Sequence, residues 1–179
     1  MSLSNRFLRF LGNIGILPEQ IIPNEPVALK PIGIVRNRVR EPRMEGWEDV
    51  ASDVIVRKKL TGALDGIEGY SHIIVLFHLH RVSDEERSQL HRHPRGDERY
   101  PLQGVFATRT QHRPNPVGVT VVRLLRRRRN VLRVKGLDAI NGTPVLDIKP
   151  YLPPYDVPED VRLPEWVTQP PLPPASRGQ

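Results

Sequence analysis

The chain contains no cysteine, few aromatic residues and no long apolar run, and each absence removes a class of protein. Without cysteine there is neither a disulfide framework nor a thiolate nucleophile or ligand, which suits a reducing compartment and leads us to expect a cytoplasmic protein. Aromatic residues are 6% of 179, which gives little support to a platform that stacks single-stranded bases. The longest apolar run, Ile73 to Phe77, is far shorter than the roughly 20 residues that cross a membrane.

Glycine-rich nucleotide fingerprints are also missing. The sequence has no G-x-G-x-x-G and no G-x-x-x-x-G-K-[ST] segment. Both motifs let backbone amides approach a phosphate at the start of a helix, so their absence argues against a Rossmann or a P-loop domain.

Positive charge is in excess, with 27 Lys and Arg against 20 Asp and Glu and a pI near 10.2. This balance favours a polyanionic partner but does not choose among DNA, RNA and anionic lipid. Four consecutive arginines, Arg126 to Arg129, fall at a predicted hairpin tip, where Asn130 suits a positive φ. They are either a solvated loop or a finger that grips phosphates.

Short segments rich in valine and isoleucine predict an all-β protein: a small barrel, or barrel-like sandwich, with short helical insertions and extended tails. The expected strands are Ile32–Val35, Val54–Val56, His72–His80, Gly104–Arg109, Val119–Arg126, Val131–Lys135 and Val145–Ile148. Only Ser83 to Leu90 reads as a helix, with Ser83 and Glu86 placed for a capping box. We expect an N-terminal extension over 1–28, a barrel domain over 29–155 and a proline-rich tail over 156–179, because residues 150–179 hold nine of the 19 prolines.

The segment from Gly104 to Thr120, GVFATRTQHRPNPVGVT, is the strongest candidate site. Pro114 and Pro116 hold Arg113 and Asn115 in extended conformations, so a stiff turn presents a guanidinium and a carboxamide. A plain hairpin turn whose polar groups face water is the alternative.

Three other groups are weaker candidates. His78 and His80 would share a strand face, but no third ligand is recognisable, so no metal is expected. Asp138 follows a predicted strand and either accepts hydrogen bonds from a ligand or caps its own turn. Asp147 and Lys149 lie two apart on a strand, where they pair with each other or line a cleft.

Several of these strings together resemble the TsaA-like, TrmO-type tRNA methyltransferases. They are GIVRN (33–37), GIEGYSHIIVLFHLHR (66–81), GVFATRTQHRPNPVG (104–118) and GLDAINGTPVLDIKPY (136–151). The resemblance implies a homodimeric β-barrel that binds S-adenosyl-L-methionine without a Rossmann fold. It also implies methylation of the exocyclic nitrogen of threonylcarbamoyladenosine beside the tRNA anticodon.

By the same resemblance, residues at several loops hold the methyl donor: Pro42, Arg43, Met44, His80, Arg81, Arg109, Val119, Lys135, Gly136, Leu137 and Asp138. Arg113 and Asn115, with Lys149 and Tyr151, are expected near the substrate. Arg113, Asn115 and His80 are the implied catalytic residues.

The acylated nitrogen of this substrate must lose a proton, and His80, His112 and Asp138 are the candidate bases. The chain departs from the family at Thr110-Gln111, where Ser-Pro is more usual, and at Asn141, where Asp is frequent. Longer members carry an additional C-terminal domain where this chain has its proline-rich segment. Two alternatives therefore stay open: a donor-binding regulator or RNA-binding module without turnover, and a methyltransferase for another small acylated substrate.

Overall fold

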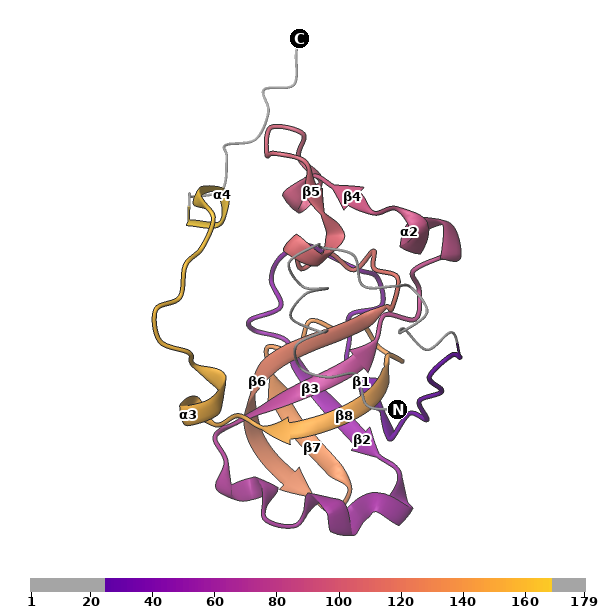
Figure 1. Ribbon diagram of the computed structural model, residues 1–179. Helices are drawn as coiled ribbons and strands as arrows, with labels where there is room; N and C mark the ends of the chain where they lie inside the picture. The colour runs from indigo at the N-terminus through magenta and orange to yellow at the C-terminus, as the bar shows by residue number, and fades with distance from the viewer. Residues whose placement is uncertain (1–24, 169–179) are drawn as a thin grey trace, which may run out of the picture.

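Alternating apolar positions fold into a closed barrel of six antiparallel strands in the computed structural model, which describes residues 25–168 (Figure 1). The strands are β1 (Gly33–Arg36), β2 (Ala51–Val56), β3 (His72–His78), β6 (Val117–Arg128), β7 (Val131–Lys135) and β8 (Pro144–Pro150). Their order around the barrel is β1-β2-β7-β6-β3-β8, and β8 returns to β1. Closure of the sheet leaves no unpaired strand edge, so the predicted all-β barrel is confirmed.

The inward-facing side chains of these strands form the hydrophobic core. β3 shows the pattern plainly, because Ile73, Val75 and Phe77 are buried while the residues between them are half-buried. Branched side chains suit this pleated, close-packed interior. The fully enclosed residues include Val35, Val54, Ile73, Val75, Val122, Leu132, Val134, Leu137 and Val145.

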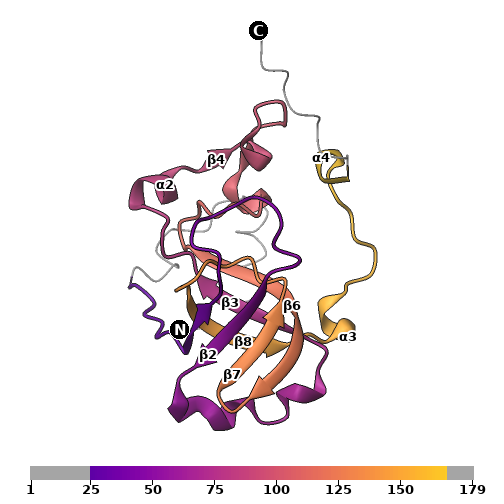
Figure 2. The same ribbon diagram turned by 180° about the vertical axis from the view of Figure 1, so that it is seen from behind.

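Short helices and a small lobe lie at the two ends of the barrel. The helical turns η2 (Lys58–Leu64) and η3 (Ile67–Gly69) lie at one end, beside the turn between β6 and β7. The lobe lies beyond the other end (Figures 1 and 2) and contains α2 (Asp84–Ser88), β4 (His91–Arg92), η4 (Pro94–Gly96), β5 (Gln103–Gly104) and η5 (Val105–Ala107). After β8 the chain forms two single turns, α3 (Pro153–Asp156) and α4 (Glu165–Thr168). No helix among residues 25–168 is long and apolar enough to cross a membrane.

Most predicted strands differ from the observed ones by a few residues at their ends, and two were predicted to continue well past the residue where the strand stops. The segment Gly104–Arg109 forms only the end of β5 and then η5, because the amide and hydroxyl of Thr108 both donate to Val105 O and close a local turn. The predicted strand His72–His80 ends at His78 instead, since the His80 amide donates back to His78 O at 2.8 Å. The outer face of β3 is half-buried rather than covered, because the strand belongs to a single-walled barrel.

Two turn predictions had mixed outcomes. The capping box is confirmed, since Ser83 Oγ accepts from the Glu86 amide and the Glu86 carboxylate accepts from the Ser83 amide. The positive φ of the β6–β7 turn falls on Arg129, at 55°, and not on Asn130, whose side chain donates to Val56 O. The predicted N-terminal extension is mostly outside the described residues, as is the end of the proline-rich tail.

Candidate functional site

Three loops meet at one end of the barrel because its strands are antiparallel. Arg36, the last residue of β1, pairs with Asp53 of β2, and His78, the last residue of β3, pairs with Val117 of β6. The end of β7 likewise pairs with the start of β2. The connecting segments 37–50, 79–116 and 136–143 therefore lie at the same end, opposite η2 (Figures 1 and 2). We call this the loop end.

Asn37 joins two of these loops by hydrogen bonds that sequence reasoning did not find. Its Nδ2 donates to Ser52 Oγ at 2.9 Å and to Ala139 O at 2.8 Å, and its amide donates to Asn141 Oδ1 at 3.3 Å. Ser52 is fully buried, so an apolar residue at either position would leave a buried polar group unpaired. Asn37 is the last residue of the GIVRN string, and its place in that string was the only feature of the sequence that pointed to a role for it.

Ion pairs fix the same loops from outside. Arg81 Nη1 lies 2.8 Å from Glu41 Oε2, which joins segment 37–50 to segment 79–116. Lys135 Nζ lies 2.8 Å from Asp49 Oδ1, and the Gly136 amide donates to Val50 O at 3.0 Å. These contacts join the three segments that contain most of the predicted donor-site residues.

Pro42, Arg43 and Met44 form an exposed bend in the first loop. The Arg43 guanidinium lies 4.9 Å from the centre of the Trp47 ring, and Trp47 Nε1 donates to Arg43 O at 2.9 Å. Met44 is 75% exposed. The bend is held by its own contacts and presents an uncovered apolar side chain.

Asp138 lies on the third loop and faces β6. Its carboxylate accepts a hydrogen bond from Thr120 Oγ1 and is exposed. Arg109 reaches the same strand, since its Nη2 donates to Val119 O at 3.0 Å. The Leu137 side chain is fully buried in the core, so this residue offers a ligand only its backbone.

The predicted stiff turn is built as a braced loop. Arg113 Nη1 donates to Thr108 O and Thr110 O, both at 3.1 Å, and the guanidinium lies 6.0 Å from the Phe106 ring centre. Asn115 is exposed, and its carbonyl accepts from the Val117 amide at 2.7 Å. Arg113 therefore stabilises the conformation of the loop through these hydrogen bonds. The Asn115 side chain makes no such contribution among the described residues.

His80 and His112, the two candidate bases among the histidines of the loop end, differ in what surrounds them. Burial lowers the pKa of His80 below 6.5, and the charges of Arg81 and His78 act in the same direction against a backbone hydrogen bond at His78. Burial and the charge of Arg92 lower the pKa of His112, against the carboxylate of Glu86. Arg92 Nη2 lies 3.2 Å from His112 Nδ1 and can only donate, so that nitrogen is occupied as an acceptor. His80 is the better candidate base.

Lys149 and Tyr151 lie elsewhere. Lys149 Nζ pairs with Asp147 Oδ2 at 2.8 Å, and the Tyr151 amide donates to His72 O at 3.2 Å. Val117 pairs with His78 at the end of β3, six residues of strand or about 20 Å beyond His72. Lys149 pairs with Ile74, four residues or about 13 Å from His78. One protomer does not bring these two residues next to Arg113 and Asn115.

The loop end shows no protein metal centre. Residues 25–168 hold no group of three or more His, Asp or Glu side chains that could bind a metal ion. What it offers is an exposed acid, a bend with an apolar side chain, a largely neutral imidazole and anchored guanidiniums. Such a set suits a small ligand with apolar and charged parts better than a metal ion.

Comparisons with known proteins place this arrangement in a family. Residues 36–157 match the tRNA-methyltransferase O N-terminal domain. A probable S-adenosyl-L-methionine-binding protein of Pyrococcus abyssi is 39% identical over 142 residues, which cover 76% of this chain and 74% of that protein. The human tRNA (adenine(37)-N6)-methyltransferase is 39% identical over 102 residues, 57% of this chain and 23% of the human one.

Solved structures agree with the sequence matches. A crystal structure of TrmO from Pseudomonas aeruginosa superposes with a TM-score of 0.61 at 34% identity, covering 77% of this chain and 62% of that one. A second TrmO crystal structure gives 0.65 at 32% identity, over 82% and 66%. This chain thus spans about two thirds of the solved proteins. The match over residues 36–157 includes all three loops, and the chain belongs to the family of the tRNA-methyltransferase O N-terminal domain.

Proposed function

We propose that the loop end binds S-adenosyl-L-methionine and directs its methyl group to the exocyclic nitrogen of threonylcarbamoyladenosine beside a tRNA anticodon. The family match carries the proposal, because it spans every segment that forms the loop end. The human relative, named for the exocyclic nitrogen of adenine 37 in tRNA, supports the choice of substrate.

The residues present fit a methyl donor of this kind. Asp138 is an exposed carboxylate whose oxygens can accept from a ribose hydroxyl or an amine. Met44 and Phe106 are 75% and 78% exposed, so apolar surface for a purine ring is available on two of the loops. When bound, S-adenosyl-L-methionine supplies an electrophilic methyl group.

His80 would accept the proton that the substrate nitrogen must lose. That nitrogen is acylated, so its lone pair is delocalised and deprotonation increases its reactivity. The lowered pKa keeps the His80 imidazole neutral near pH 7, which is the form that accepts a proton. One ring nitrogen of His80 hydrogen-bonds to the backbone of His78, and the other ring nitrogen is the one that would accept the proton.

Arg113 and Asn115 would orient the substrate. Because Nη1 of Arg113 is anchored on two carbonyls, the guanidinium has a fixed direction and its Nε and Nη2 edge stays available for a carboxylate. The threonyl group of the substrate carries such a carboxylate. The exposed Asn115 carboxamide can donate to and accept from the same nucleoside.

A donor-binding protein without turnover is the second candidate. The relative from Pyrococcus abyssi is named for binding alone, and Thr110-Gln111 changes the loop that Arg113 braces. A methyltransferase for another small acylated substrate is the third.

One experiment separates the three candidates. The protein is incubated with labelled S-adenosyl-L-methionine and tRNA from normal cells, or tRNA from cells that cannot make threonylcarbamoyladenosine. Label only in normal tRNA supports the proposal, and donor binding without transfer supports the second candidate. Label that enters a small-molecule extract but neither tRNA supports the third.

We also propose that the protein works in the cytoplasm as a homodimer. Val117, Val119 and Val121 form an exposed apolar stripe on the outer face of β6, which a second copy would cover. A partner copy could also supply the distant Lys149 and Tyr151. Light scattering at micromolar concentration should give about twice 20.4 kDa, and a monomer would count against a shared site.

A further inference from the structure

A β-bulge lies directly before the run Arg126–Arg129. Leu124 pairs with Val134 and Arg126 with Arg133, so Leu125 is an extra residue in β6. Because side chains alternate along a strand, this insertion shifts the faces by one residue. Arg126 and Arg128 consequently point outward, while Arg127 points toward η2 and is only 14% exposed.

The Arg127 guanidinium donates all of its hydrogen bonds to other residues of the protein. Its Nη1 donates to Leu64 O at 2.7 Å and Glu68 Oε2 at 3.2 Å. Its Nη2 donates to Asp65 Oδ1 at 2.7 Å and Thr61 O at 3.3 Å, and its Nε to Arg129 O at 3.0 Å. All five N–H groups of this guanidinium are used, so it is a structural residue.

The outward residues form what we call the arginine face: Arg123, Arg126 and Arg128 of β6 with Arg133 and Lys135 of β7. Arg123 lies directly opposite Lys135, and Arg126 directly opposite Arg133. Like charges at opposed positions of neighbouring strands destabilise a sheet. The barrel thus carries two unfavourable cation pairs side by side.

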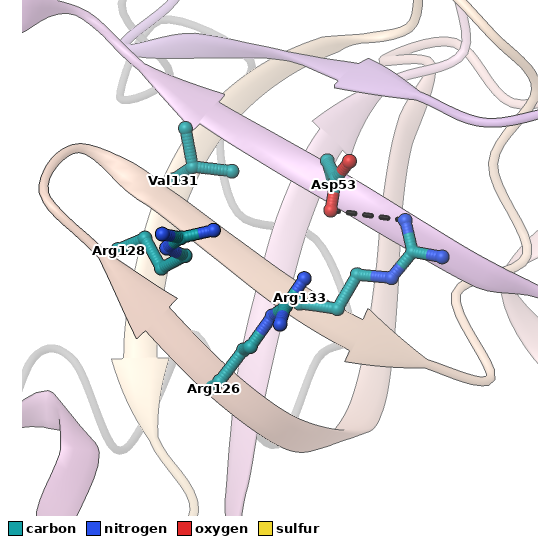
Figure 3. A pocket seen from close by; sticks show the side chains of 5 residues that line it. All are labelled: Asp53, Arg126, Arg128, Val131 and Arg133. Carbon is teal, nitrogen blue, oxygen red and sulfur yellow. Dashed lines mark hydrogen bonds and ion pairs between the residues drawn. The ribbon is translucent and has the colours of Figure 1, made fainter.

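Acidic residues neutralise only one member of each pair. Asp53 Oδ1 lies 3.0 Å from Arg133 Nη1, and Asp49 pairs with Lys135. Arg123, Arg126 and Arg128 form no ion pair with any described residue. Arg126, Arg128 and Arg133, with Asp53 and Val131, line a hollow of about 300 Å³ on this face (Figure 3). Three guanidiniums around one hollow leave a net positive charge there.

We propose that the arginine face is a second RNA-binding surface, which holds the phosphate backbone of the RNA whose base is presented at the loop end. Guanidiniums bind phosphate oxygens bidentately, and an external polyanion would relieve both cation pairs. Arg126 lies nine residues beyond Val117, about 30 Å along β6. A structured RNA is long enough to contact both places. This inference rests on the proposed tRNA substrate for its partner, but its test does not need methyl transfer.

The test compares two variants within the run, one that removes the two outward arginines and one that removes the inward Arg127. Binding of purified tRNA to the full chain is measured by fluorescence anisotropy over a series of salt concentrations, for the parent, Arg126→Ser/Arg128→Ser and Arg127→Ser. Arg126→Ser/Arg128→Ser loses two phosphate contacts, so the plot of log K against log salt should become less steep by about 1.4–1.8. Binding at low salt should also weaken. Arg127→Ser should lower the melting temperature and leave the slope near that of the parent.

A second control covers the case in which Arg127→Ser does not fold. Lys30 and Arg162 are exposed and lie outside β6 and β7, so Lys30→Ser/Arg162→Ser removes the same charge elsewhere. Its slope should match the parent. An unchanged slope for Arg126→Ser/Arg128→Ser, or an equal fall in the control, would overturn the proposal. If the parent protein transfers no methyl group to tRNA but the variants still differ in salt slope, that result contradicts the proposed function and leaves the proposed RNA-binding surface standing.

Discussion

Gly118, at the start of β6 beside the loop end, has no room for a side chain. A Cβ added at this position would lie 2.4 Å from Cε2 and 2.5 Å from Cζ of Phe77, which it faces across the β3–β6 ladder. Carbon atoms in contact are normally 3.5–4.0 Å apart, so the overlap exceeds about 1 Å. Phe77 is 2% exposed and enclosed by the core, so its ring cannot move into solvent.

We therefore expect Gly118→Ala to destabilise the fold by about 2 kcal/mol, within the range of 1–3 kcal/mol for overpacked cores. In a protein of this length that corresponds to a fall of roughly 4–8 °C in melting temperature. Thermal unfolding followed by circular dichroism measures it. Gly104→Ala is the matched control, because a Cβ at Gly104 has no atom within 4 Å and its φ is −62°.

A double variant tests the cause of the effect. If the overlap with the ring is responsible, Phe77→Leu should cost less in the Gly118→Ala background than in the parent, and the two changes should couple by more than about 0.5 kcal/mol. Gly118→Ala with the parent's melting temperature, or additive effects of the two substitutions, would refute the reasoning.

Three further predictions concern the loop end. Asp138→Ala should weaken S-adenosyl-L-methionine binding in calorimetry by about 1–3 kcal/mol, the loss typical of a hydrogen bond to a charged group, and unchanged affinity would place the donor elsewhere. Because burial lowers the pKa of His80 below 6.5, its base form persists to lower pH than that of an ordinary histidine, so the midpoint of the acid limb of the single-turnover rate should lie below pH 6.5. His80→Gln should abolish this acid limb, and an unchanged limb would assign it to another group. Asn115→Ala should reduce the transfer rate on the order of 100-fold with donor affinity preserved, and a rate within about threefold of the parent would return residues 112–116 to a plain turn.

The strands could be predicted where apolar alternation is strong, and the failures have local causes. Val131–Lys135 was predicted to the residue, because every second side chain is apolar and a turn precedes it. Gly104–Arg109 has strand-like composition, yet Thr108 closes a turn on Val105, and composition does not show which hydrogen bonds a segment will form. The bulge at Leu125 is invisible in the sequence for a similar reason, since only the partner strand shows that β6 holds an extra residue.

The sequence predicted which residues belong to the candidate site better than it predicted how those residues are arranged. The RPNP turn identified Arg113, but its anchoring on Thr108 O and Thr110 O depends on how the preceding loop folds back. The pairing of Asp147 with Lys149 was one of two expected outcomes, and it is confirmed. Asn37 was missed because its partners, Ser52 and Ala139, are 15 and 102 residues away in the chain.

The barrel is closed by a short seam, and this determines where it opens. β1 meets β8 over two residue pairs, Gly33–Val145 and Ile34–Pro144, whereas β3 and β6 share seven. Pro144 has no amide hydrogen to add to that ladder. We therefore expect local unfolding to begin at this seam and to expose Val35 and Val145 to water while the other ladders persist. In hydrogen exchange the amides of Ile32, Val35 and Gly142, which bond across the seam, should report this opening.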